Sequence, residues 1–289
     1  MPHDMSLAEA AFAYDDTVRG VVRSSLRTPQ PQGRLPPNTV VVSADDHWSC
    51  TEDIFWQGFP KHLKPRAPRW IGGPEGHWAV NGQPVIPLDR AAALKEHEMV
   101  PGEHALEPRL RDLDAEGIDK EIVFPNGVAG FYTFRDLYVR EWIFRTHNEY
   151  LAGLQAKAPG RFYGVGLVNY WDMPKARESI DELKALGVKT AFLPQYPRDG
   201  EGRDIDYCSA ELEPLWTALE ESGLPVCFHV GEFAKGGRGA IGIGAMVGFG
   251  PFRKTLGELS GGGGRDRHPG LQVVFTECEI NWVPGALQN

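Results

Sequence analysis

The sequence of 289 residues contains no uninterrupted apolar run that approaches the roughly 20 residues needed to cross a membrane. Its first residues lack a basic segment followed by an apolar core, which argues against a signal peptide. Lysine and arginine are also fewer than aspartate and glutamate, so the formal net charge is -9 at pH 7. Nucleic acid and anionic membrane surfaces are therefore poor candidates for the main partner, and we expect a small-molecule substrate.

Cysteine is scarce as well. The four cysteines, Cys50, Cys208, Cys227 and Cys278, form no CxxC pair, and their wide spacing indicates reduced thiols in a cytoplasmic protein. The sequence also lacks the GxSxG and P-loop patterns, which argues against a serine hydrolase elbow and against a phosphate-binding loop.

The chain is predicted to have two parts. Residues 1–38 are interpreted as an N-terminal extension with a proline-rich linker, which wraps the domain or mediates assembly of a homo-oligomer, expected to be a dimer. Residues 39–289 form the domain. Its first strand is predicted over 39–44, and a long segment up to residue 103 then lacks sustained periodicity. Such a loop is typical either of a lid over a binding site or of surface decoration.

From residue 106 onward, strand and helix patterns alternate regularly. Further strands are predicted over 120–124, 162–168, 189–193, 224–230 and 272–276, and helices over 106–116, 134–158, 173–186, 213–222 and 250–259. Strands that alternate with helices require right-handed βαβ units around a parallel sheet, so the predicted fold class is α/β.

The predicted architecture is a TIM-like (β/α) barrel that is incomplete, with about six of eight units. The chain stops where the helix after the sixth strand should begin. Two alternatives follow: a barrel that lacks its last two units because the chain is truncated, or an open sheet of six strands.

The segment 224–230 is apolar on both faces and ends on His229. Sites of α/β proteins lie at the carboxyl ends of the strands. Asp45 and His47 end the first strand and, being two residues apart, point the same way. Together the three side chains are predicted to hold a divalent ion, Zn²⁺, Mn²⁺ or Fe²⁺. The alternative is that each histidine is a hydrogen-bonded core residue.

Other polar residues also follow predicted strands. Glu277 ends the sixth strand and is predicted to act in catalysis as a proton-transfer or ligand-orienting group, the alternative being an ion pair with a loop. Neutral side chains at other strand ends are predicted to bind substrate: Asn126, Asn169, Gln195 and Tyr196.

A glycine motif at 237–242 matches GxGxxG by its letters. The dinucleotide-binding fingerprint directly follows a strand and opens a helix, which is not the context here. We therefore interpret this motif as a flexible loop at the site, with a nicotinamide-dependent oxidoreductase as the alternative.

Taken in order, the motifs resemble the amidohydrolase-related family, in the branch of the amidohydrolase superfamily that includes aminocarboxymuconate-semialdehyde decarboxylase-like enzymes. The resemblance spans about residues 39–289. It rests on VSADDH at 42–47, EGID at 116–119 with VFP at 123–125, FHVG at 228–231, HPGL at 268–271 with VFTE at 274–277, and WVP at 282–284.

The resemblance implies a TIM-like barrel with one divalent metal, zinc first, held by Asp45, His47 and His229. It also implies a last aspartate ligand after an eighth strand, which this chain lacks, and Asp45 stands where a histidine is commoner. In the family's decarboxylases a histidine that activates the metal-bound water stands at the position of Glu277.

The function predicted first is hydrolysis of a C–N or C–O bond in a small organic, carboxylic substrate by metal-activated water. The alternative is metal-dependent, non-oxidative decarboxylation of an aromatic or unsaturated acid. A second alternative is an inactive fragment or binding module, because an open sheet exposes strand edges to partners.

Overall fold

The computed structural model describes residues 35–50, 54–71, 77–80, 83–84, 101–126, 128–230 and 250–288. Its centre is a six-stranded sheet in the order β1-β5-β6-β7-β8-β9, and each neighbouring pair is parallel. The strands are β1 (Val42–Ser49), β5 (Lys120–Asn126), β6 (Phe162–Leu167), β7 (Thr190–Phe192), β8 (Val226–His229) and β9 (Val273–Thr276). The order follows the chain, as in consecutive units of a (β/α) barrel, and confirms the prediction of an incomplete TIM-like barrel.

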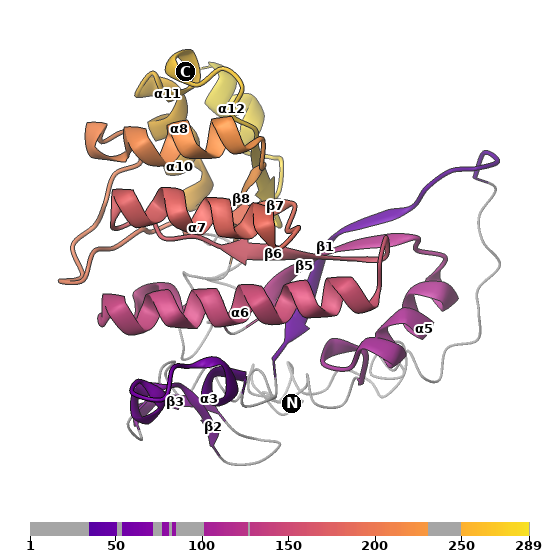
Figure 1. The fold of residues 1–289 in the computed structure, drawn as a ribbon. Helices are drawn as coiled ribbons and strands as arrows, with labels where there is room; N and C mark the ends of the chain where they lie inside the picture. The colour runs from indigo at the N-terminus through magenta and orange to yellow at the C-terminus, as the bar shows by residue number, and fades with distance from the viewer. Residues whose placement is uncertain are drawn as a thin grey trace, which may run out of the picture.

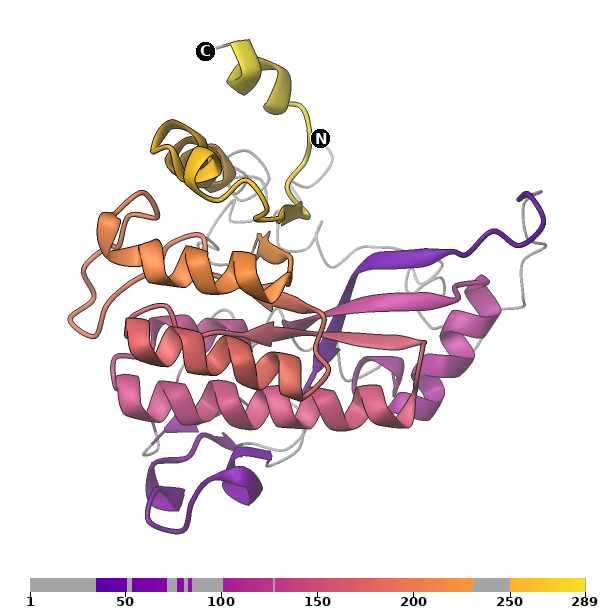
Figure 2. The ribbon, with the colours of Figure 1, turned by 45° about the horizontal axis from the view of Figure 1, so that its top comes forward.

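Helices cover the outer face of this sheet, one after another along it (Figures 1 and 2). They are α5 (Leu106–Glu116), α6 (Leu137–Lys157), α7 (Met173–Ala185) and α8 (Glu213–Ser222), followed near the C-terminus by α10 (Gly250–Gly261), α11 (Gly264–Arg267) and α12 (Val283–Gln288). The predicted bounds of α5 and α8 are confirmed. Both end at a glycine with a positive φ, 73° at Gly117 and 70° at Gly223, a conformation that glycine adopts without steric cost.

Two predicted boundaries are wrong for local reasons. Helix α6 begins at Leu137, later than predicted, because the Asp136 side chain accepts a hydrogen bond from the Val139 amide and caps the helix there. Strand β1 covers 42–49, whereas 39–44 was predicted, so Asp45 and His47 lie inside the strand. The later part of the strand is polar, so its hydrophobicity did not indicate a strand.

The segment 48–103 is also more regular than predicted in its described part. It contains α3 (Ile54–Gly58) and a small antiparallel sheet formed by β2 (Arg69–Ile71), β3 (His77–Val80) and β4 (Gln83–Pro84), together with short 3₁₀ turns. The ring of Phe55 lies 5.0 Å from that of Trp78 and 5.6 Å from that of Phe131. This part of the segment is therefore packed onto the domain, and aromatic contacts rather than a periodic stripe hold it there.

Strands β5 and β6 pair only over residues 121–123 and then separate. Beyond that point, Asn148 of α6 donates to the carbonyl of Leu167 and accepts from its amide, both at 2.8 Å. The side-chain amide thus takes the place of a neighbouring strand. It provides hydrogen-bond partners for the buried carbonyl and amide of Leu167.

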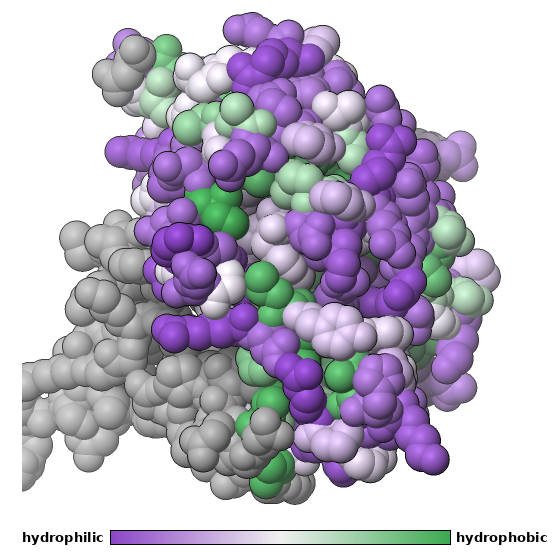
Figure 3. All heavy atoms as spheres, turned by 60° about the vertical axis from the view of Figure 1, so that its left-hand side comes forward, coloured by the Kyte–Doolittle hydropathy of each residue, from purple (hydrophilic) through white to green (hydrophobic). Residues whose placement is uncertain are grey.

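Two further predictions concern regions outside the described residues. Most of the extension, residues 1–34, lies there, as does the glycine motif at 237–242. The boundary at residue 38 therefore stays a prediction. Among the helices that are described, none combines the length and apolarity that a membrane span needs. The surface visible in Figure 3 is largely hydrophilic, with hydrophobic residues in small scattered groups.

Candidate metal centre

Three potential metal ligands converge at the open end of the curled sheet. Asp45 and His47 come from β1 and His229 comes from β8, with three strands between them in the sheet order. Curvature nevertheless brings one ligand atom of each residue within 4.8 Å of the others. The prediction that these side chains meet agrees with this geometry, and the donor set of one carboxylate and two imidazoles suits Zn²⁺, Mn²⁺ or Fe²⁺.

The imidazole of His229 is oriented as a metal ligand requires. Its Nδ1 lies 2.6 Å from the carbonyl of Val230, which can only accept, so Nδ1 carries a proton. Its Nε2 lies 2.9 Å from Oδ1 of Asp45. A backbone carbonyl on one nitrogen and a ligand on the other is the usual arrangement of metal-binding histidines. The residues present therefore fit a divalent ion.

The electrostatics of His229 differ from those of an exposed histidine. Burial alone lowers its pKa, but the hydrogen bonds to Asp45 and to the Val230 carbonyl outweigh burial, so the pKa is raised. Without metal, Nε2 of His229 is hydrogen-bonded to Oδ1 of Asp45, and this bond favours the protonated imidazole. A metal ion must displace the proton on Nε2 in order to bind.

Aromatic rings form the floor of the centre. The rings of His47 and His229 meet edge to face, 4.9 Å apart, and the ring of Phe124 lies 4.7 Å from that of His229. Phe124 belongs to β5 and is 2% exposed. Sequence reasoning did not assign it to the site, although its position just before Pro125 at a strand end was a usable signal.

Glu277 lies beside the three ligands. Its carboxylate is 3.4 Å from Nε2 of His229, and its side chain is 52% exposed. Partial burial raises the pKa of Glu277, the nearby His229 lowers it and Asp45 raises it, and the net shift is upward. Glu277 also has a φ of 47°, which is rare for a residue with a side chain. The group is thus held in a strained conformation and binds a proton more readily than an ordinary glutamate.

The residues predicted to bind substrate lie in different parts of the structure. Gln195 is buried and donates from Nε2 to the carbonyl of His229 at 2.9 Å, so it supports a ligand residue. Tyr196 follows it and is half-buried. Asn126 ends β5, but its side chain lies outside the described residues.

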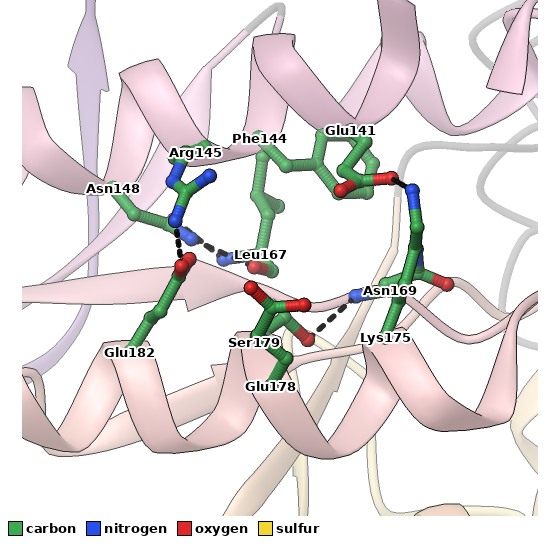
Figure 4. Close-up of a pocket in the computed structure, with 10 residues that line it drawn as sticks. All are labelled: Glu141, Phe144, Arg145, Asn148, Leu167, Asn169, Lys175, Glu178, Ser179 and Glu182. Atoms are coloured by element: carbon green, nitrogen blue, oxygen red, sulfur yellow. Dashed lines mark hydrogen bonds and ion pairs between the residues drawn. The ribbon is translucent and has the colours of Figure 1, made fainter. Parts of the chain in front are cut away.

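Asn169 is not brought to the metal centre. It lies in a groove between α6 and α7, where Lys175 reaches Glu141 and Arg145 reaches Glu182 (Figure 4). Its side-chain oxygen accepts from the amides of Trp171 and Asp172, at 3.1 and 3.0 Å. The chain turns outward after β6 to enter α7, and Asn169 stabilises that turn. Its role in substrate binding stays a prediction.

Solved structures with the same fold belong to amidohydrolases and decarboxylases. An amidohydrolase from Mycobacterium avium subsp. paratuberculosis matches with a TM-score of 0.66 and 20% identity, over 88% of this chain and 76% of that chain. A dihydroxybenzoic acid decarboxylase from Polaromonas, with bound manganese and an inhibitor, matches with a TM-score of 0.58 and 18% identity, over 82% and 64%. A 5-carboxyvanillate decarboxylase from Novosphingobium aromaticivorans, complexed with manganese, matches with a TM-score of 0.58 and 21% identity, over 86% and 69%.

At these identities the similarity shows the fold. This chain spans about two thirds of the length of the dihydroxybenzoate decarboxylase structures that it matches. No curated protein matches it significantly in sequence. The family model described as Amidohydrolase does match, over residues 74–289, which is about three quarters of the chain. With that match, the shared fold and the three convergent ligands, this chain belongs to the amidohydrolase family.

Proposed function

We propose that this chain catalyses the metal-dependent, non-oxidative decarboxylation of an aromatic acid. The observation that carries the proposal is the placement of Glu277, with its raised pKa, directly beside Asp45, His47 and His229. Support comes from the decarboxylases of dihydroxybenzoate and carboxyvanillate, whose fold this chain shares. This choice replaces hydrolysis, which was predicted first, with the alternative.

Asp45, His47 and His229 would hold one divalent ion. The ion would polarise the substrate carboxylate and neighbouring oxygens, which fixes the acid in place and stabilises negative charge. Manganese is the first ion to test because three of the matching decarboxylase structures contain it, and zinc is the second.

Glu277 supplies the proton that the reaction consumes. When the bond between the ring carbon and the carboxylate breaks, CO₂ leaves and its electron pair stays on the ring carbon. Protonated Glu277 donates its proton to that carbon, becomes a carboxylate and is reprotonated by solvent. The raised pKa of Glu277 favours this role, since a general acid must hold its proton near the working pH.

Gln195 and Phe124 prepare the centre for this step. Gln195 holds the backbone carbonyl of His229, and Phe124 packs against its ring. Both contacts limit the motion of the imidazole before an ion or a substrate binds. Less freedom is then lost on binding.

The test combines metal content with product analysis. The purified chain is loaded with Mn²⁺, its metal content is measured by mass spectrometry, and it is incubated with 2,6-dihydroxybenzoate and 5-carboxyvanillate labelled with ¹³C in the carboxyl group. We expect about one ion per chain, release of labelled CO₂, and loss of both in His229→Ala. His62→Ala, which changes an exposed histidine, should retain both.

In the second part of the experiment, the metal-loaded chain is incubated with amides and lactones of the same acids. Hydrolysis of these compounds without release of CO₂ from the acids would replace decarboxylation with the reaction predicted first. A chain that contains metal but converts none of the compounds would instead favour the inactive binding module.

A further inference from the structure

Strand β1 contains one extra residue at the first of the candidate metal ligands. Ser43 pairs with Glu121, and Asp46 pairs with Val123. Three steps along β1 therefore match two steps along β5, which is the signature of a β-bulge. The bulge occupies Ala44 and Asp45.

The bulge decides which face carries the ligands. Residues two apart on β5, such as Glu121 and Val123, share a face, so their partners Ser43 and Asp46 share it too. That face is the outer one, because Val123 packs with Leu151 and Leu154 of α6. In a regular strand Asp45 and His47 would share the face of Ser43 and point at the helices. With the bulge they point inward, where they meet His229.

A buried ionic cluster holds Asp46 on the outer face. Arg109 of α5 contacts Asp46 at 3.1 Å and Glu121 at 2.6 Å through its terminal nitrogen, and its Nε donates to Glu121 at 2.7 Å. The side chain of Glu121 is fully buried, and that of Arg109 is 12% exposed. The guanidinium thus links α5 to both strands, at the one residue of β1 that lies between the two ligands.

We infer that Arg109 is a positioning residue for the metal centre: by holding Asp46 outward against Glu121, it fixes the bulge that turns Asp45 and His47 inward. The inference rests on the proposed metal centre, but the Asp45–His229 contact through which it acts exists without metal. A purely structural ion pair would stabilise the fold without affecting the geometry of the ligands.

The first measurement is Mn²⁺ affinity, followed by electron paramagnetic resonance, together with the unfolding temperature in chelator. In Arg109→Met we expect the dissociation constant for Mn²⁺ to rise about 10- to 100-fold, as when outer-sphere partners of metal ligands are removed. Arg109→Lys, which keeps the charge, should recover part of the affinity. Arg161→Met breaks the ion pair of Arg161 with Asp114 of α5 and should leave the affinity unchanged.

The double variant Arg109→Met/Glu121→Met covers the case in which the single variant does not fold. It removes the buried carboxylate together with its partner, so the fold should be retained. We expect the Mn²⁺ affinity of this double variant to be reduced as it is in Arg109→Met. Wild-type affinity in a folded double variant would overturn the inference.

A second readout separates this inference from the proposed function. In metal-free protein, the Nε2 proton of His229 bonded to Asp45 should give a downfield resonance in wild type that is lost in the double variant. If wild type binds no metal, the proposed function fails, and this resonance still decides the inference: its loss supports the role of Arg109, and an unchanged resonance overturns it.

Discussion

Gln195 donates a hydrogen bond from its side-chain amide to the backbone carbonyl of His229 at 2.9 Å, and both residues are buried. The bond ties the loop after β7 to the last residue of β8. His229 is therefore held at three points, by Gln195 at its carbonyl and by Val230 and Asp45 at its ring.

Gln195→Leu should destabilise the protein and weaken metal binding together. It leaves a buried carbonyl without its donor, which costs about 1–3 kcal/mol of unfolding free energy. Urea unfolding and a Mn²⁺ titration measure the two effects. Gln155→Leu is the matched control, since Gln155 makes the same kind of bond to the Gly187 carbonyl away from the centre. Equal metal affinities in the two variants would contradict the supporting role of Gln195.

Metal affinity should fall as the pH falls. The pKa of His229 is raised in the metal-free protein because its bonds to Asp45 and Val230 outweigh burial, so a proton competes with the ion for Nε2. Below that pKa, the loss should approach about tenfold per pH unit for one displaced proton. Titrations between about pH 6 and pH 8 measure it, and an affinity that stays flat over that range argues against His229 as a ligand.

The same pKa shift predicts how the stability of the metal-free protein depends on pH. A histidine with a raised pKa in the folded state stabilises the fold fully below its ordinary pKa. That contribution is lost as the pH rises through the raised value. Comparing the urea unfolding of wild type and His229→Gln across this range isolates the contribution of His229.

Glu277→Gln should reduce turnover without removing the metal. Loss of a general acid typically costs about 10²- to 10⁴-fold in kcat, while glutamine keeps the shape of the side chain. Decarboxylation kinetics and Mn²⁺ affinity are the two measurements. Glu279→Gln is the control, because Glu279 is exposed and has a similar φ of 51°. A variant with normal turnover would rule out Glu277 as the proton donor.

His147 should make the protein sensitive to acid. It is fully buried on α6, and its ring nitrogens have no hydrogen-bond partner among the described residues. Burial lowers its pKa to about 3. Only the unfolded chain binds a proton here between that value and the ordinary pKa, so stability falls as the pH falls. From pH 7 to pH 5 the loss is about 2 kcal/mol.

His147→Leu tests this prediction, because leucine cannot take up a proton. Urea unfolding at both pH values should show a smaller loss of stability than in wild type. His62→Leu, at an exposed position, should behave like wild type. An unchanged pH dependence in His147→Leu would show that other groups cause the acid sensitivity.

Sequence patterns predicted the helices better than they predicted β1, the strand that carries two of the three candidate ligands. Helix α8 was predicted because Leu215, Trp216 and Leu219 recur at helical spacing and a glycine follows. In β1, one face carries Asp45 and His47 while Asp46 points toward α5, so the apolar signal of a strand is missing. The bulge leaves no pattern in the sequence at all, because it depends on pairing with β5.

The candidate ligands could be predicted and their partners could not. His229 stands out as a polar residue at the end of an apolar strand, and Asp45 and His47 lie two residues apart, just after the predicted first strand. Phe124 of β5 meets His229 only through the curvature of the sheet. Gln195 meets it from the loop after the neighbouring strand β7, and residue spacing specifies neither contact. The predicted homodimer stays a prediction.

The left-handed backbone conformation of Glu277 lowers the stability of the fold, while its side chain serves the proposed reaction. A residue other than glycine in this conformation costs about 1–3 kcal/mol, and glycine would relieve most of it. Glu277→Gly should therefore give a more heat-resistant protein without a proton donor. Evolution toward stability alone would remove this side chain, so a search for stabilising substitutions in the purified protein should find position 277 among them and enrich inactive variants there.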